Sequence, residues 1–169
     1  MAVFNITGVL RTFVDAGVDF IVVGGVAASM NGAVVNTQDI DLVHSRAPEN
    51  VARIVGVLET LEAFCRFPAE RRLRPNASHL TGRGHVNLTT LIGYVDLLGT
   101  IGNGLGYEDL LPHSQWMVAD EGLTVRVLDL ETLIKLKEEL GRDKDRYMLP
   151  ILRQALKLKQ AKDLPSSAG

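Results

Sequence analysis

Two aspartates, Asp39 and Asp41, alternate with apolar residues in the segment 39–43. Because successive side chains of a strand point to opposite faces, both carboxylates would project from one face, with Ile40 and Leu42 turned to the core. Carboxylates held this close repel one another, and their pKa values stay high unless a cation lies between them. A ligand set made only of oxygen suits Mg²⁺ or Mn²⁺ rather than zinc. The pair therefore predicts a divalent-metal site.

The residues before this pair fit a phosphate group. Gly24 and Gly25 end a short run of β-branched residues, and a backbone without side chains can approach a ligand closely. A short helix is predicted directly afterwards, and its free N–H groups would face an anion. A dinucleotide-binding turn would need Gly-x-Gly-x-x-Gly, which two adjacent glycines do not match. The sequence thus predicts a phosphate site beside the metal site.

A third acid, Asp96, lies alone in the otherwise apolar segment 94–98. An isolated acid in such a strand requires a partner or a function, because burying an unpaired charge is costly. If its strand lies beside the strand of Asp39 and Asp41, the three carboxylates could hold two ions about 4 Å apart, with Asp96 as general base. The alternative is a buried acid paired with an arginine.

The elements that must position these residues follow from apolar periodicity, caps and turn residues. Helices are predicted from the Asn5 cap to Gly17, around 27–30, over 48–61, from the Asp129 cap to Gly141, and over about 144–161. Strands are predicted over 19–23, 39–43, 85–90, 94–98, 116–119 and 123–128. Residues 64–84 show no clear period and are predicted to be irregular and exposed. This order favours an α/β (α+β) fold with a small mixed sheet flanked by helices.

Composition limits the classes of protein that this chain can represent. It has 169 residues, 46% hydrophobic residues and a formal net charge of −2, which excludes a strongly basic nucleic-acid coat and an acidic disordered tail. The single cysteine, Cys65, cannot form an internal disulfide and is predicted to be a small core residue.

No signal peptide or membrane-spanning run is recognised, so we expect a cytoplasmic protein with no membrane partner. The histidines match no metal spacing and are predicted to lie at the surface: His44, His79, His85 and His113.

The combination of Gly24-Gly25, Asp39-Ile40-Asp41 and the later Asp96 resembles the signature of the polymerase-beta-like nucleotidyltransferase superfamily. The segments 36–43, 127–137 and 141–145 are similar to its AbiEii-type toxin and minimal nucleotidyltransferase branch. The resemblance implies a nucleotidyltransferase core over 1–128 and a helical C-terminal extension over 129–169, packed on the core as one structural domain. It also implies transfer of a nucleoside monophosphate from an NTP such as ATP to an acceptor hydroxyl, with Mg²⁺ or Mn²⁺. Asp39, Asp41 and Asp96 would be the metal-binding and catalytic residues. The nucleotide would contact Gly24, Gly25, Thr37, Lys137, Arg142 and Lys144.

Two positions depart from the pattern of this family. Many members have Ser after the first glycine, whereas here Gly25 is followed by Val26, and Asn36 stands where related sequences have Arg or Lys before Thr37. The alternative function is therefore a nucleotidyltransferase-like binding module with weakened catalysis, acting as an antitoxin or adaptor. For Lys137, the alternative to contacting the nucleotide is an ordinary solvated side chain on a charged face of the helix.

The acceptor and the partners stay open at this stage. The acceptor hydroxyl could belong to a tRNA, a protein or a small molecule, and a cognate partner protein of a toxin–antitoxin system or a homodimer is expected. The arginines between Arg66 and Arg83 either attract a polyanion such as tRNA or only solvate a loop. The basic C-terminal helix is a candidate surface for a second protomer.

Overall fold

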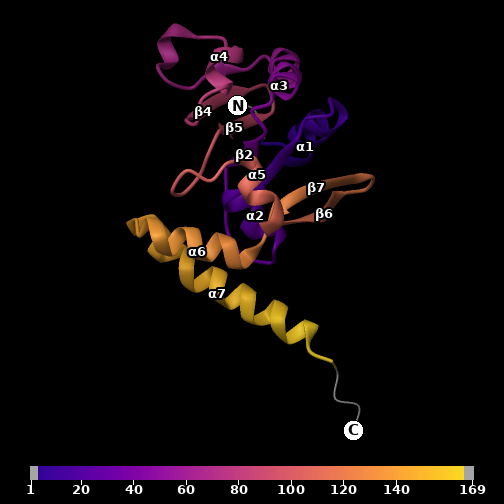
Figure 1. The fold of residues 1–169 in the computed structure, drawn as a ribbon, viewed down its shortest axis with the longest axis vertical. Coiled ribbons are helices and arrows are strands. Elements are labelled where there is room, and N and C mark those ends of the chain that lie inside the picture. Colours follow the sequence, from indigo (N-terminus) through magenta and orange to yellow (C-terminus); the bar gives the residue numbers. More distant parts are fainter. Residues whose placement is uncertain (1–3, 166–169) are drawn as a thin grey trace.

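The computed structural model describes residues 4–165, and its centre is a seven-stranded mixed sheet (Figure 1). The strands are β1 (Phe20–Val23), β2 (Asp39–His44), β3 (Phe64–Cys65), β4 (His85–Thr90), β5 (Gly93–Leu98), β6 (Ser114–Asp120) and β7 (Leu123–Leu128). Their order across the sheet is β3-β4-β5-β2-β1-β7-β6. β2 is parallel to β5 and β1 is parallel to β7, while the other neighbours are antiparallel. The predicted α/β class with a mixed sheet is confirmed.

Strand sequences explain which parts of the sheet are buried. β1 consists of four apolar residues, all buried, as expected of a central strand covered on both faces. β2 and β5 alternate, so that Ile40, Leu42, Val95 and Leu97 are fully buried on one face. The opposite face of the same two strands carries the aspartates, which leaves the polar groups together on one side of the sheet.

Some helices begin or end at residues that satisfy their free backbone groups. They are α1 (Ile6–Asp15), α2 (Gly24–Met30), α3 (Pro48–Thr60), α4 (Ala77–Leu80), α5 (Tyr107–Leu110), α6 (Leu130–Leu140) and α7 (Asp143–Asp163), with 3₁₀ turns η1 (Ala69–Arg71) and η2 (Leu111–His113). The side chain of Asn5 accepts from the Gly8 N–H at the start of α1, and Asp129 accepts from the Thr132 N–H at the start of α6. Gly141 ends α6 in the left-handed conformation with φ of +58°.

Helices cover the sheet at two places. Apolar residues of α1, α3 and α4 share one buried cluster with the apolar face of the sheet. α6 and α7 lie side by side next to α2, and α7 extends beyond the sheet (Figure 1). Leu152 and Ala155 of α7 are buried, which anchors this long helix to the rest of the protein. No helix within residues 4–165 is both long enough and apolar enough to cross a bilayer.

Three expectations about local structure are wrong. The segment after α3 is not entirely irregular and exposed, because Phe64 and Cys65 pair with β4 as the edge strand β3, and Leu80 of α4 is buried. A two-residue strand is too short to show a period in the sequence. Cys65 is half-buried rather than a core residue, since its strand lies at the edge of the sheet.

His44 is the third exception. It is 1% exposed, whereas the other three histidines are exposed as expected. Its Nδ1 atom lies 3.0 Å from the backbone oxygen of Ser45. Burial lowers the pKa of His44 below its ordinary value, so the ring is neutral and acts as a packed core residue at the end of β2.

Candidate active site

Three aspartates meet on the open side of the sheet. β2 and β5 are parallel neighbours whose register places Asp41 opposite Asp96 and Asp39 opposite Tyr94. Paired residues of neighbouring strands point to the same face, so the three acids face one another. One carboxylate oxygen from each acid lies within 4.8 Å of the others. The expected juxtaposition of Asp96 with the pair on β2 is therefore present.

The cluster is electrostatically strained, as the raised pKa of Asp41 shows. The pKa of Asp41 rises from 3.8 to about 7, first because burial penalises its charge and then because Asp39 and Asp96 lie close by. A hydrogen bond with Asp96 also raises this pKa, while the charge of Lys144 lowers it. Within residues 4–165, neither Asp39 nor Asp41 forms an ion pair with a basic side chain. A divalent cation fits this oxygen-only donor set, because it would neutralise carboxylates that no basic side chain pairs.

Asp96 has a second partner, Arg66, which follows β3. The Nη2 atom of Arg66 donates to Oδ1 of Asp96 at 2.9 Å and to the backbone oxygen of Leu88 at 3.1 Å. Its guanidinium lies 4.4 Å from the centre of the Tyr94 ring. Both interpretations of Asp96 thus hold at once, because it belongs to the acidic cluster and also pairs with an arginine. Arg66 was not identified from the sequence, where it lies in a segment without periodicity.

Thr37, Gly24 and Gly25 pack tightly around the two aspartates of β2, Asp39 and Asp41. The Thr37 hydroxyl lies 2.9 Å from the backbone oxygen of Asp39 and 3.2 Å from its Oδ1, which fixes the direction of that carboxylate. Gly24 begins α2 with φ of +66°, and a Cβ atom there would overlap Oδ2 of Asp41. A Cβ atom at Gly25 would lie 3.0 Å from Cβ of Thr37. Packing against β2 therefore requires glycine at position 24, independently of any phosphate.

A cavity of about 580 Å³ opens above the cluster. One part of its lining consists of the three aspartates with Gly24 and Gly25, and another part, called the basic wall below, comes from α6 and the start of α7. This wall carries the three cations singled out in the sequence, Lys137, Arg142 and Lys144. A cavity lined by both clustered carboxylates and basic side chains can hold metal ions together with a polyphosphate.

The buried Asp145 holds two of these cations in place. Its carboxylate accepts from Lys137 Nζ at 3.2 Å and from Arg142 Nε at 2.7 Å. Burial would raise the pKa of Asp145, but the hydrogen bonds from Arg142 and Lys137 outweigh it and the pKa lies below its ordinary value. Lys137 is therefore half-buried and paired rather than part of a solvated stripe. The importance of Asp145 was missed, because the sequence shows an acid between basic residues but not that its side chain turns inward.

The two positions that depart from the family pattern lie away from the cavity. Val26 is buried in the core, and Asn36 is exposed. Neither side chain lines the cavity above the aspartates.

Comparison with known proteins identifies the fold. A solved structure from Thermotoga maritima, described as a candidate nucleotidyltransferase, matches with a TM-score of 0.55 over 89% of each chain, at 18% sequence identity. No family model matches the chain, and no curated protein matches it significantly. At this identity the likeness concerns the fold alone, which is a nucleotidyltransferase fold with a C-terminal helical part.

Proposed function

We propose that this protein is a metal-dependent nucleotidyltransferase that moves a nucleoside monophosphate from an NTP to an acceptor hydroxyl. The observation that carries the proposal is the cluster of Asp39, Asp41 and Asp96 in a cavity that is also lined by basic residues of α6 and of the start of α7. The nucleotidyltransferase fold of the similar Thermotoga protein supports the same chemistry. The AbiEii-type branch is part of this proposal and rests on the sequence resemblance.

The two parts of the cavity lining would bind different groups, the metal ions and the triphosphate. Asp39 and Asp41 would hold divalent ions, and bound ions would supply charge neutralisation for the triphosphate and favour ionisation of the acceptor hydroxyl. The triphosphate lies between the backbone of Gly24 and Gly25 and the basic wall of α6 and α7. Lys137 contacts the phosphates from a fixed position, because Asp145 restrains its side chain.

Asp96 is placed to act on the acceptor. Its carboxylate accepts the proton of the acceptor hydroxyl as the oxygen attacks the α-phosphorus. A new oxygen–phosphorus bond forms, the bond to the bridging oxygen of the β-phosphate breaks, and pyrophosphate leaves. Arg66 orients the Asp96 carboxylate through the hydrogen bond at 2.9 Å. The rate would come from positioning and charge neutralisation.

The adaptor alternative has less support. It rests on Val26 and Asn36, and neither residue lines the cavity. A protein that had lost catalysis would have no need to keep three unpaired or partly paired carboxylates together, because their repulsion costs free energy of folding. We therefore prefer the transferase.

The test uses purified protein, Mg²⁺, each α-labelled NTP in turn, and a crude cell extract that is afterwards separated into RNA, protein and small molecules. Wild type is expected to label one fraction. Asp39→Asn and Asp41→Asn are expected to lower labelling at least about 100-fold, since charge stabilisation by bound ions contributes several kcal/mol. Asp120→Asn, which removes an exposed carboxylate of β6, is the matched control and should keep full activity.

Calorimetry with NTPs and Mg²⁺ separates the two functions. A transferase should bind triphosphate in a metal-dependent manner, whereas an adaptor should not. Labelling that is unchanged in Asp39→Asn and Asp41→Asn would refute the assignment of these residues.

A further inference from the structure

The aspartate-bearing face of the sheet continues past the active site toward the edge strand. Strand register aligns Phe64 of β3, Thr89 of β4 and Tyr94 of β5 in one row across the sheet. Tyr94 is 44% exposed and Thr89 is also exposed, so no helix within the described part of the chain covers these two residues. The opposite face of the same strands is buried. This part of the sheet is therefore open on the side where the chemistry takes place.

Arginines stack on the aromatic rings of this open row. The guanidinium carbons of Arg72 and Arg74 lie 4.3 Å and 4.0 Å from the centre of the Phe64 ring, and Arg66 covers Tyr94. These five residues, Phe64, Arg66, Arg72, Arg74 and Tyr94, are called the arginine–aromatic surface below. Four of them line a hollow of about 430 Å³, which is within the usual size of a small-ligand pocket.

The charge of this region differs from that of the whole protein. Residues 62–83 contain five arginines and two glutamates, in a chain whose net charge is −2. Of the residues that the structure describes, none forms an ion pair with Arg72 or Arg74. Phe67, next to Arg66 in the chain, is 72% exposed. Glu62 also lines the hollow, and Arg66 is paired with Asp96. The surface thus offers aromatic rings together with two arginines, Arg72 and Arg74, that no described acid pairs.

Arg66 connects this hollow to the active site. Its guanidinium contacts the Tyr94 ring, which lines the hollow, and the Asp96 carboxylate, which lines the cavity above the aspartates. Arg66 therefore links a residue that lines the hollow to a residue that lines the cavity above the aspartates. A molecule seated in the hollow would contact Arg66, which is itself paired with Asp96.

We propose that the arginine–aromatic surface binds the end of a single-stranded polynucleotide, whose terminal nucleoside lies in the hollow with its hydroxyl toward Asp96. Arginine pairs with phosphates, and both guanidinium groups and aromatic rings stack on bases. Arginines and aromatic rings also occur together at protein–protein interfaces. The excess of arginines over acidic residues in 62–83 favours a partner with a regular series of negative charges, which a phosphate backbone provides. The proposal rests on the proposed transferase function, because it names the class of the acceptor.

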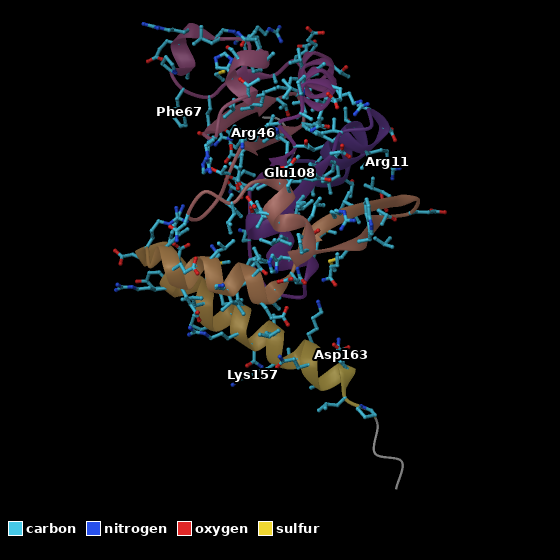
Figure 2. All side chains as sticks on the ribbon, in the orientation of Figure 1. Arg11, Arg46, Phe67, Glu108, Lys157 and Asp163 are labelled. Carbon is cyan, nitrogen blue, oxygen red and sulfur yellow. The ribbon has the colours of Figure 1, made fainter. Side chains whose placement is uncertain are left out.

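Binding is measured by fluorescence anisotropy with a labelled RNA strand of about 12 nucleotides, the DNA strand of the same sequence and the corresponding RNA duplex. The buffer contains EDTA and no NTP, so the result does not depend on catalysis. The test variant is Arg72→Ala/Arg74→Ala. The matched control is Lys157→Ala/Lys162→Ala, which removes the same charge from α7, where Lys157 lies at the opposite end of the molecule from Phe67 (Figure 2). Circular dichroism verifies that each variant is folded, and Arg72→Gln/Arg74→Gln, which keeps part of each side chain on Phe64, replaces the alanine variant if that one unfolds.

The wild type is expected to bind one of the single strands and to bind the duplex at least about tenfold more weakly, because paired bases stack on one another and cannot stack on the guanidinium groups that cover the rings. The arginine variant is expected to weaken binding at least about tenfold at physiological salt. The slope of its log affinity against log salt concentration should decrease by about 0.7 for each phosphate that the variant no longer neutralises. The lysine control should stay within about twofold of wild type. The affinities for the RNA strand and for the DNA strand of the same sequence decide which polymer the protein binds.

Three results would overturn the proposal: no binding of either single strand, equally tight binding of the duplex, or equal losses in the two double variants. Label that enters only the protein or small-molecule fraction would overturn it as well, and would leave the transferase standing. If instead oligonucleotide binding depends on the arginines while no NTP is ever transferred, the surface stands and the proposed function fails.

Discussion

Replacing Asp41 by asparagine tests whether the metal-free aspartate cluster costs free energy of folding. The pKa of Asp41 is about 7 in the folded protein and 3.8 in a solvated chain, chiefly because of burial and then because of Asp39 and Asp96. The folded state therefore holds the proton more tightly than the unfolded state, and ionisation of Asp41 destabilises the fold. This loss of stability is absent below about pH 4, grows as the pH rises from 4 to 7, and is complete above 7.

The size of the effect follows from the two pKa values. A change from 3.8 to about 7 corresponds to about 4 kcal/mol, at 1.36 kcal/mol for each pKa unit. Asparagine has no charge, and its amide N–H can donate to Asp96 as the protonated acid does. In EDTA at pH 8, Asp41→Asn should be more stable than wild type by up to about 4 kcal/mol, which is about 10 °C in melting temperature for a chain of this size. At pH 4 the two proteins should differ little.

Urea unfolding followed by circular dichroism, at pH 4, 6 and 8 in EDTA, measures this difference. Asp120→Asn is the control, because its carboxylate is exposed and its pairing with Arg11 at 3.5 Å is weak. That variant should show no rise in stability between pH 4 and 8 relative to wild type. A difference between Asp41→Asn and wild type that is the same at pH 4 and pH 8 would refute the electrostatic reasoning.

Three further predictions concern the same cavity. Mg²⁺ should raise the wild-type melting temperature, because it binds only the folded cluster, and a rise that persists in Asp41→Asn would place the ion elsewhere. Gly24→Ala should lose more stability and more Mg²⁺ binding than Gly122→Ala. Both glycines have φ of +66°, but only a Cβ atom at Gly24 would overlap Asp41, so equal losses would contradict the packing argument. Asp145→Asn should lower the free energy of unfolding by about 1–3 kcal/mol and raise KM for NTP more than it changes kcat, because Lys137 loses its buried partner. An unchanged KM would show that Asp145 serves folding alone.

Local sequence was sufficient wherever a feature depends on neighbouring residues. The alternation around Asp39 and Asp41 placed both carboxylates on one face, because side chains alternate along any strand. The caps Asp129 and Gly141 set the ends of α6, because they satisfy backbone groups within one turn. The aspartate pair, the glycine turn and most helices and strands were predictable on these grounds.

Contacts between distant segments required the tertiary structure. The sequence suggested Asp96 as a third ligand, but only the parallel pairing of β5 with β2 brings it to Asp41. The sequence does not predict the pairing of Arg66 with Asp96. The edge strand before Arg66 has only two residues, which is too short to show an alternation that would predict where its side chain points. His44 and Asp145 are polar residues that the sequence alone would place in solvent, and each is buried beside partners that satisfy it.

The residue types and their spacing thus determined that this protein has the groups for a metal and a phosphate. The order of the strands decided which of those groups meet, and which basic side chains face them. The physical reason is that backbone periodicity and capping are local, whereas strand pairing and ion pairs depend on burying apolar surface shared by residues far apart in the chain.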